Sequence, residues 1–308
     1  MTGWEKLGGV PRARLIEARL QLHHAAQPAA AVGKLLLPHQ EDFGEQSFRW
    51  SAAGRCLVQG AVTLGSAATP FRAALRPAPP ALLLLDAGGG VLYELPLAGR
   101  TLGETYDWLA ARLAGLLGTR LLGELERPAG LPAHPLADGA RFDATDADAF
   151  AELARLFANA DRALAAWAAT WPGASAVRCW PHHFDIATLA PHAPASPAPE
   201  ALGPESPAPA PGSRANPAAA EEARTVSAGM VPGDSGRAEP YFYVTPWPHP
   251  EAAEWPPLPG GASWNMDGWL GAALEAPRFM DPGEAAGQAA AVETFLRSAA
   301  AACRLLLG

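Results

Sequence analysis

Two histidines and a carboxylate stand within four residues in the segment 179–185, which reads Cys-Trp-Pro-His-His-Phe-Asp. As an extended strand, this segment would project His183 and Asp185 to one face and His182 to the other. A histidine and an aspartate on one face offer either two metal ligands or a base with its orienting carboxylate. We therefore predict a catalytic or metal-binding role for His183 and Asp185, with His182 as the alternative histidine.

A metal site would need a third ligand from elsewhere in the chain, and a divalent metal is the one candidate cofactor that the residues suggest. The candidates for this third position are His23, His24, Asp234 and Glu239. In the alternative interpretation, one histidine hydrogen-bonds to the backbone in the core and Asp185 pairs with an arginine. The residue types leave both interpretations open, and no specific cofactor is predicted.

A second polar and aromatic stretch follows at 233–247. Its beginning, Pro-Gly-Asp-Ser-Gly at 232–236, has the composition of a turn, and a strand should follow. Tyr241 and Tyr243 would share one face of that strand, where Asp234 and Glu239 could supply further catalytic carboxylates. We predict that the two tyrosines and Trp247 contact a substrate; the alternative is an edge strand with ordinary aromatic packing.

These segments resemble an uncharacterised bacterial family of domains of unknown function. The similar pieces are a Leu-His-x-x-x-Gln segment at 22–27, the Cys-x-Pro-His-His-Phe-Asp segment at 179–185, and a Ser-x-Gly…Pro-Gly-Asp segment at 227–234 before the aromatic strand. The resemblance covers the core of the chain and leaves out 191–223. It implies no reaction, but it favours a single set of site residues, which are His23, Gln27, His182, His183 and Asp185.

The elements that must position these residues follow from hydrophobic periodicity and turn signals. We predict strands at Arg14–Leu22, Lys34–Leu37, Ser47–Ser51, Cys56–Gln59, Leu82–Asp86, Val91–Leu95, Ser175–Leu189, Thr225–Met230 and Pro240–Thr245. A helix should begin after Thr101, because Thr101-Leu102-Gly103-Glu104 has the form of a capping box. A longer helix should contain Phe150, Leu153, Phe157, Leu164 and Trp167 on one stripe, and a last helix should cover 282–307.

These elements predict an α+β protein with an antiparallel sheet or sheets and three main helices packed on them. The predicted organisation is an N-terminal strand-rich half at 1–122 that ends in a helix, and a C-terminal helix-strand-helix half at 143–308. Between two strands of the second half lies a segment rich in proline and alanine at 191–223. This composition predicts a disordered insertion, because it offers little apolar area to offset the entropy of ordering.

Composition excludes several classes of partner. The chain has a net charge of −8 and no cluster of lysine and arginine along the sequence, which argues against nucleic acids and anionic membranes. We find no secretory signal at the N-terminus and no disulfide or metal spacing among Cys56, Cys179 and Cys303. These observations predict a cytoplasmic protein with reduced thiols, and they leave a small-molecule ligand as the candidate partner. The sequence does not indicate an oligomeric state.

The leading hypothesis for function is a cytosolic small-ligand-binding protein or metal-dependent enzyme with a site of histidine, aspartate, glutamate and tyrosine. The competing hypothesis is a non-catalytic binding or scaffold protein in which the same side chains are structural. Geometry discriminates between them, because a site requires these groups to converge at an accessible place rather than to be paired individually in the core. Whether the chain is an enzyme is left open by its sequence.

Overall fold

The computed structural model describes residues 3–63, 70–118, 121, 123–192, 224–252, 254–281 and 283–308. Eleven strands form one antiparallel sheet. The strands are β1 (Phe48–Ser51), β2 (Cys56–Gln59), β3 (Phe71–Pro77), β4 (Pro80–Asp86), β5 (Val91–Pro96), β6 (Arg178–Trp180), β7 (Asp185–Pro191), β8 (Thr225–Val231), β9 (Tyr241–Trp247), β10 (Ser263–Asn265) and β11 (Gly271–Glu275). Their order across the sheet is β10-β11-β9-β8-β7-β6-β1-β2-β3-β4-β5, so β6 pairs with β1, which lies far from it in the sequence.

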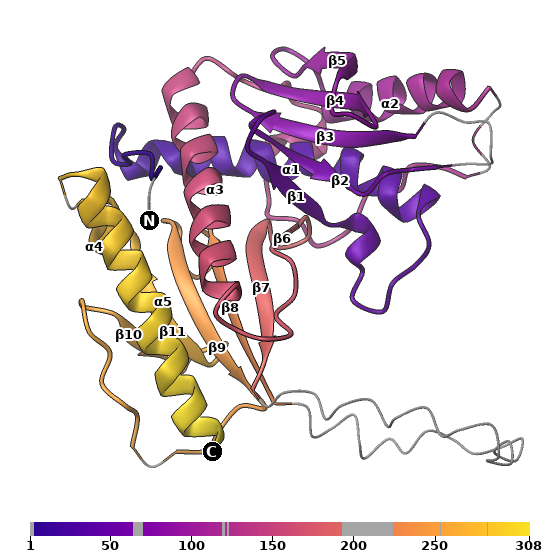
Figure 1. Cartoon of the computed structure of the whole chain (residues 1–308). Helices are drawn as coiled ribbons and strands as arrows, with labels where there is room; N and C mark the ends of the chain where they lie inside the picture. The colour runs from indigo at the N-terminus through magenta and orange to yellow at the C-terminus, as the bar shows by residue number, and fades with distance from the viewer. Residues whose placement is uncertain are drawn as a thin grey trace, which may run out of the picture.

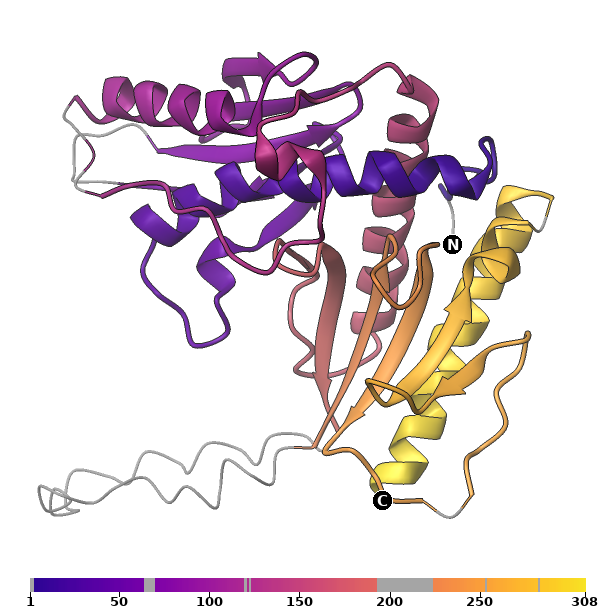
Figure 2. The ribbon, with the colours of Figure 1, turned by 180° about the vertical axis from the view of Figure 1, so that it is seen from behind.

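Five α-helices accompany the sheet in the described part of the chain. They are α1 (Arg12–Leu36), α2 (Leu102–Leu117), α3 (Ala147–Ala168), α4 (Ala276–Met280) and α5 (Ala285–Leu307), with short 3-10 turns at Gly44–Gln46 and Pro135–Asp138. Helix α5 packs on β8 and β9, α3 on β7 and β8, and α1 on β3 and on α3. The sheet twists so strongly that α3 and α5 lie in front of β7–β9 in Figure 1, whereas α1 lies behind β1–β3 (Figures 1 and 2).

The alternation of side chains along the strands gives the sheet two different faces. On β8 and β9, side chains such as Met230 and Phe242 join the main core beneath the helices. Their neighbours Gly229 and Tyr243 project to the opposite side, which we call the second face. The second face therefore carries those residues of the aromatic strand that were predicted to contact a ligand.

The α+β class and the antiparallel sheet are confirmed, but the prediction of three main helices missed α1. The predicted strands at Arg14–Leu22 and Lys34–Leu37 are wrong, because α1 contains the first segment and the second as far as Leu36, with Leu37 as its C-cap. Alanines at Ala25, Ala26 and Ala29 favour a helix intrinsically, and nearly every side of the helix from position 18 to 33 is buried. A helix that is buried all round has no apolar stripe, so its period is not visible in the sequence.

Most other predicted elements are present. The capping box holds the start of α2, where the Thr101 hydroxyl accepts from the Glu104 amide and the Glu104 carboxylate accepts from the Thr101 amide. The stripe of the longer helix is confirmed in α3, whose N-cap is Asp146. Strand β3 was not predicted, and the hairpin between β4 and β5 closes through a glycine-rich turn.

The predicted strand Ser175–Leu189 is wrong in its middle. A turn at 181–184 divides it into β6 and β7, which pair with each other as a hairpin. The two strands that flank the proline-rich segment pair directly, with Pro191 opposite Thr225. The predicted disordered insertion at 191–223 lies outside the described residues from position 193 onward. The division into two halves stays a prediction.

All three cysteines are free and buried. None of the described helices is long and apolar enough to span a membrane.

Candidate functional site

Two side chains of α1 contact the backbone of the turn between β6 and β7 through hydrogen bonds. The His23 ring nitrogen Nε2 lies 3.2 Å from the carbonyl oxygen of His182, and the Gln27 amide donates to the carbonyl oxygen of Pro181 at 2.7 Å. Gln27 also donates to the carbonyl of His23, one helical turn earlier. The two residues that the family resemblance singled out in α1 therefore fix the backbone of the predicted histidine segment.

Phe184 turns inward at the end of this turn, and this decides where the histidines lie. It has a left-handed φ of 57°, and its amide donates to the carbonyl of Trp180. The Phe184 ring is buried and stacks on His23, with ring centroids 5.4 Å apart. The chain therefore presents His182 and His183 to solvent, with their rings 4.3 Å apart.

Because of this turn, the sequence prediction that His183 and Asp185 share one face of a continuous strand is wrong. Asp185 is the first residue of β7, on the second face of the sheet, whereas His183 belongs to the turn. His183 still lies close enough for its charge to lower the pKa of the Asp185 carboxyl, against the stronger effect of burial. The aspartate and the exposed histidine thus remain electrostatic neighbours.

The two segments that the sequence predicted to form one site do meet, through Asp185 and Tyr243. The Tyr243 hydroxyl donates to Oδ2 of Asp185 at 2.7 Å, although β8 lies between their strands. Gly229 of β8 is opposite Tyr243, and a Cβ atom there would lie 2.4 Å from the tyrosine ring. The glycine therefore lets the ring lie across β8 to reach the carboxylate.

The Asp185 carboxyl is buried and only half satisfied. Burial raises its pKa above the usual 3.8, while the Tyr243 hydrogen bond and His183 oppose that rise. Its second oxygen, Oδ1, has no hydrogen-bond partner among the described residues. A carboxyl oxygen of this kind can accept a hydrogen bond from a ligand or, when protonated, donate one.

Asp234 is a turn residue, as predicted, and both oxygens of its carboxylate accept hydrogen bonds within the chain. Oδ1 accepts from the amides of Gly236 and Arg237, and Oδ2 accepts from the Tyr241 hydroxyl at 2.5 Å. The Tyr241 and Tyr243 rings are neighbours, with centroids 6.4 Å apart. The hydrogen bonds of Asp234 therefore order the aromatic strand beside Asp185. Both of its carboxylate oxygens are already engaged within the chain.

Three residues near this cluster were not predicted from the sequence. Trp269 stacks on Tyr241 at 6.2 Å, and the Arg237 guanidinium lies over both rings. Arg19 of α1 is buried, donates to the Gly233 carbonyl, and has an Nε atom without a partner among the described residues. Their spacing in the sequence carries no signal, because they come from three separate elements that only the fold brings together.

The other predicted site residues lie apart from Asp185 or are engaged elsewhere. Glu239 forms an ion pair with Arg12 at 2.8 Å, at the edge of α1. Trp247 is exposed at the last position of β9, with its ring against His249. His24, a candidate metal ligand, instead contacts the carbonyl oxygen of Pro132 at 3.0 Å. The described residues contain no group of three histidine, cysteine, aspartate or glutamate side chains that could hold a metal ion.

Comparison with known proteins gives a family and no activity. No curated protein and no solved structure matches the chain significantly. A model of a family of unknown function, DUF5996, matches residues 71–303. The matched range contains the β6–β7 turn, Asp185 and Tyr243, whereas His23 and Gln27 precede it. Because the match spans well over half of the chain, this protein belongs to the family of unknown function DUF5996.

Proposed function

We propose that this protein binds a small polar ligand at the β6–β7 turn and that Asp185 exchanges a proton with it. The observation that carries the proposal is the half-satisfied carboxyl of Asp185, with Oδ2 held by Tyr243 and Oδ1 left without a described partner. An unsatisfied buried oxygen is costly, so its retention favours a functional role. The proposed ligand supplies the missing hydrogen bond to Oδ1.

The chemistry of Asp185 suits proton transfer. A carboxyl whose pKa is raised by burial ionises closer to neutral pH, where it can act as a general acid or base. Tyr243 is half-buried next to it, and its hydroxyl fixes the orientation of the carboxyl. We assign Tyr243 the role of a positioning residue, supported by Gly229.

The exposed histidines supply the route between this carboxyl and solvent. Of the two histidines, His183 is the one whose charge lowers the pKa of the Asp185 carboxyl. The His182 ring packs against the His183 ring. Partial burial, together with the neighbouring His183, lowers the pKa of His182. In this proposal His183 relays the proton, and His182 contacts the ligand from the other side of the turn.

A metal-dependent version of the site would use His183 and Asp185 as ligands. Metal analysis of the purified protein, together with a His183→Ala variant, tests this version. Stoichiometric metal that is lost in the variant would favour a metal-dependent enzyme. A cytoplasmic location is part of the same proposal, and the three free, buried cysteines support it.

The proposal is tested by following the histidine resonances of His182 and His183 by NMR during titration with acetate, acetamide, glycerol and imidazole. We expect at least one probe to shift both resonances saturably, and Asp185→Asn to weaken that binding by about 10-fold or more. The matched control is Glu239→Gln, which changes a surface ion pair and should leave binding unchanged. If no probe moves either resonance, or if Asp185→Asn binds as the wild type does, the proposal fails.

A scaffold role is the second candidate, and a specific observation favours it. His23, Gln27, Asp234 and Tyr241 all have hydrogen-bond partners within the chain, and these bonds fix turns at the end of the sheet. In that case Asp185→Asn and His183→Ala would alter stability alone. Probe titration of both variants at equal folded fraction separates the two functions.

A further inference from the structure

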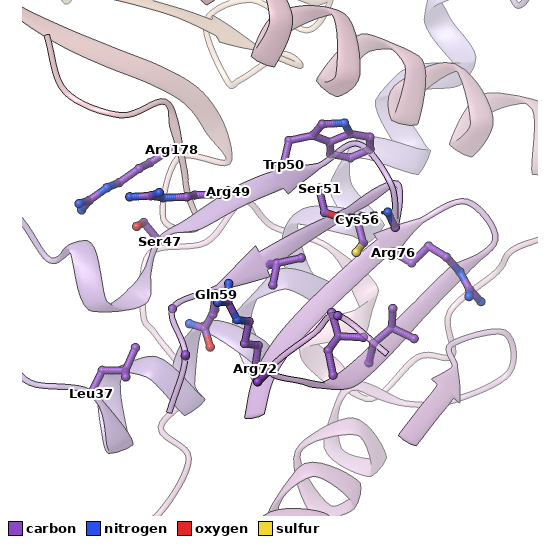
Figure 3. A pocket seen from close by; sticks show the side chains of 18 of the residues that line it. Leu37, Ser47, Arg49, Trp50, Ser51, Cys56, Gln59, Arg72, Arg76 and Arg178 are labelled. Atoms are coloured by element: carbon purple, nitrogen blue, oxygen red, sulfur yellow. Dashed lines mark hydrogen bonds between the residues drawn. The ribbon is translucent and has the colours of Figure 1, made fainter. Parts of the chain in front are cut away.

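A group of arginine side chains lies on the second face of the sheet, over strands β6, β1, β2 and β3. The register that pairs Phe48 with Cys179 places Arg49 of β1 beside Arg178 of β6. Arg72 and Arg76 of β3 lie two residues to either side of Ala74. We call these four residues, which are far apart in the sequence and come from three strands, the arginine pocket (Figure 3).

The floor of the arginine pocket is apolar. Val58, Ala74 and Leu83 are cross-strand neighbours on β2, β3 and β4, and they continue the row that begins with Arg178 and Arg49. Together with Cys56, Ala81 and Leu85 they form a small hydrophobic cluster separate from the main core. The side chains around this floor enclose a cavity of about 820 Å³, within the size range of small-molecule sites.

The positive charges of the pocket are only partly neutralised. Arg76 pairs with Glu94 at 2.6 Å, and Arg178 approaches Asp42 at 3.5 Å. Arg49 and Arg72 form no ion pair with any described residue, and the Nε atom of Arg72 is buried without a hydrogen-bond partner. The guanidinium groups of Arg49 and Arg72 can therefore donate hydrogen bonds to a ligand from two sides of the floor.

One carboxylate, that of Glu45, lies in the wall, and its oxygens contact neighbouring residues rather than the arginines of the pocket. Glu45 is buried, and its oxygens accept from the Gln40 amide and contact the His39 ring. Like charges placed opposite each other on adjacent strands, such as Arg49 and Arg178, destabilise a sheet unless an anion lies between them. This chain of net charge −8 thus places four arginines around one cavity, where a bound anion would offset their mutual repulsion.

We propose that the arginine pocket binds a small organic anion with an oxyanion head, carboxylate or phosphate, on an apolar body. Guanidinium groups bind both heads through paired hydrogen bonds, and Arg49 and Arg72 are the free groups that would do so. The apolar body lies on Val58, Ala74 and Leu83. A nucleic acid does not fit this description, because the arginines surround an apolar floor rather than follow a stripe.

Isothermal titration calorimetry of the full chain with 2-naphthoate, 2-naphthyl phosphate and neutral 2-naphthylmethanol tests the proposal. We expect one saturable site for the two anions, and binding of the neutral alcohol at least about 10-fold weaker. Arg49→Gln/Arg72→Gln should weaken both anions by about 10–100-fold. The single variant Arg49→Gln, at an exposed position, should give part of the loss without a risk to folding. Comparing the two anions decides between the carboxylate and the phosphate as the preferred head.

A control variant guards against binding elsewhere. A second cavity between α3 and α5 is lined by Trp167, Leu296, Arg297 and Arg304, and it could take a naphthyl ring. Arg297→Gln/Arg304→Gln should leave the binding of both anions unchanged. Equal affinity for the neutral alcohol, unchanged binding in Arg49→Gln/Arg72→Gln, or a loss confined to Arg297→Gln/Arg304→Gln would each overturn the proposal.

Discussion

The Tyr243 hydroxyl donates a hydrogen bond to Asp185 from two strands away, at 2.7 Å, and its ring passes directly over Gly229. The bond joins the two segments that flank the proline-rich part of the sequence. It also orients a carboxyl whose other oxygen has no described partner. The position of this buried proton-binding group therefore depends on the absence of a side chain at one residue of the intervening strand.

Substitution of Gly229 by alanine should destabilise the protein by about 1–3 kcal/mol, the usual cost of forcing atoms into a packed site. A Cβ atom would lie 2.4 Å from Tyr243 Cζ and 2.5 Å from its hydroxyl oxygen, so the ring must move away from Asp185. Urea unfolding measures the loss. Gly115→Ala is the matched control: it lies in α2 with open space around it, and should stabilise by about 0.5–1 kcal/mol. Equal stability of Gly229→Ala and the wild type would contradict the packing.

Asp185→Asn should change how stability depends on pH. Burial raises the pKa of Asp185 in the folded state above its usual 3.8, so the folded protein holds this proton more tightly than the unfolded chain. The resulting stabilisation is complete below pH 3.8 and is lost as the pH rises through the folded-state pKa. We therefore expect the free energy of unfolding of Asp185→Asn to increase relative to that of the wild type as the pH rises from about 4.

The free energy of unfolding in urea, measured for both proteins at several pH values, checks this expectation. Asp267→Asn makes the same chemical change at an exposed position and serves as the control. A difference between wild type and Asp185→Asn that stays constant across the pH range would mean that Asp185 ionises alike in both states.

The ionisation of His23 should make stability depend on pH in the direction opposite to that of Asp185. Burial, followed by the neighbouring His24, lowers the pKa of His23 from 6.5 to about 4 in the folded state. The unfolded chain then binds this proton first, so stability is complete above pH 6.5 and falls as the pH drops towards 4. That displacement corresponds to about 3 kcal/mol.

His23→Gln keeps a donor near the His182 carbonyl and removes the titration, so the variant should lose less stability than the wild type between pH 7 and 4. The comparison isolates His23 from His24 and His182, whose pKa values are also lowered. Urea unfolding at each pH provides the measurement. The assignment is wrong if the variant retains the full acid-dependent loss.

Trp167→Ala should cost about 3–5 kcal/mol, as expected for a large core side chain cut to a methyl group. Trp167 is buried on α3 and packs against Trp171, with ring centroids 5.1 Å apart. Trp247→Ala is the control, because Trp247 is 56% exposed, and its change should stay within about 0.5 kcal/mol. A loss below about 1 kcal/mol for Trp167→Ala, measured by chemical unfolding, would mean that the apolar stripe of α3 is not a core contact.

The sequence by itself determined the elements whose signals are local. The capping box of Thr101 and Glu104 located the start of α2, and the regular apolar stripe identified α3. It also indicated that residues of the segments 179–185 and 233–247 belong to one site, and Asp185 and Tyr243 of these segments do meet. These features depend on residues close together in the chain, or on one pairing of neighbouring strands.

Tertiary structure decided the rest, because the decisive distances lie between elements. Helix α1 is covered on nearly all sides and therefore shows no period, and Phe184 leaves the strand because its ring packs on His23. The arginine pocket is the clearest case. Arg49, Arg72, Arg76 and Arg178 become neighbours only through the register of β6, β1, β2 and β3, and a change of register by one residue would turn each of them to the other face.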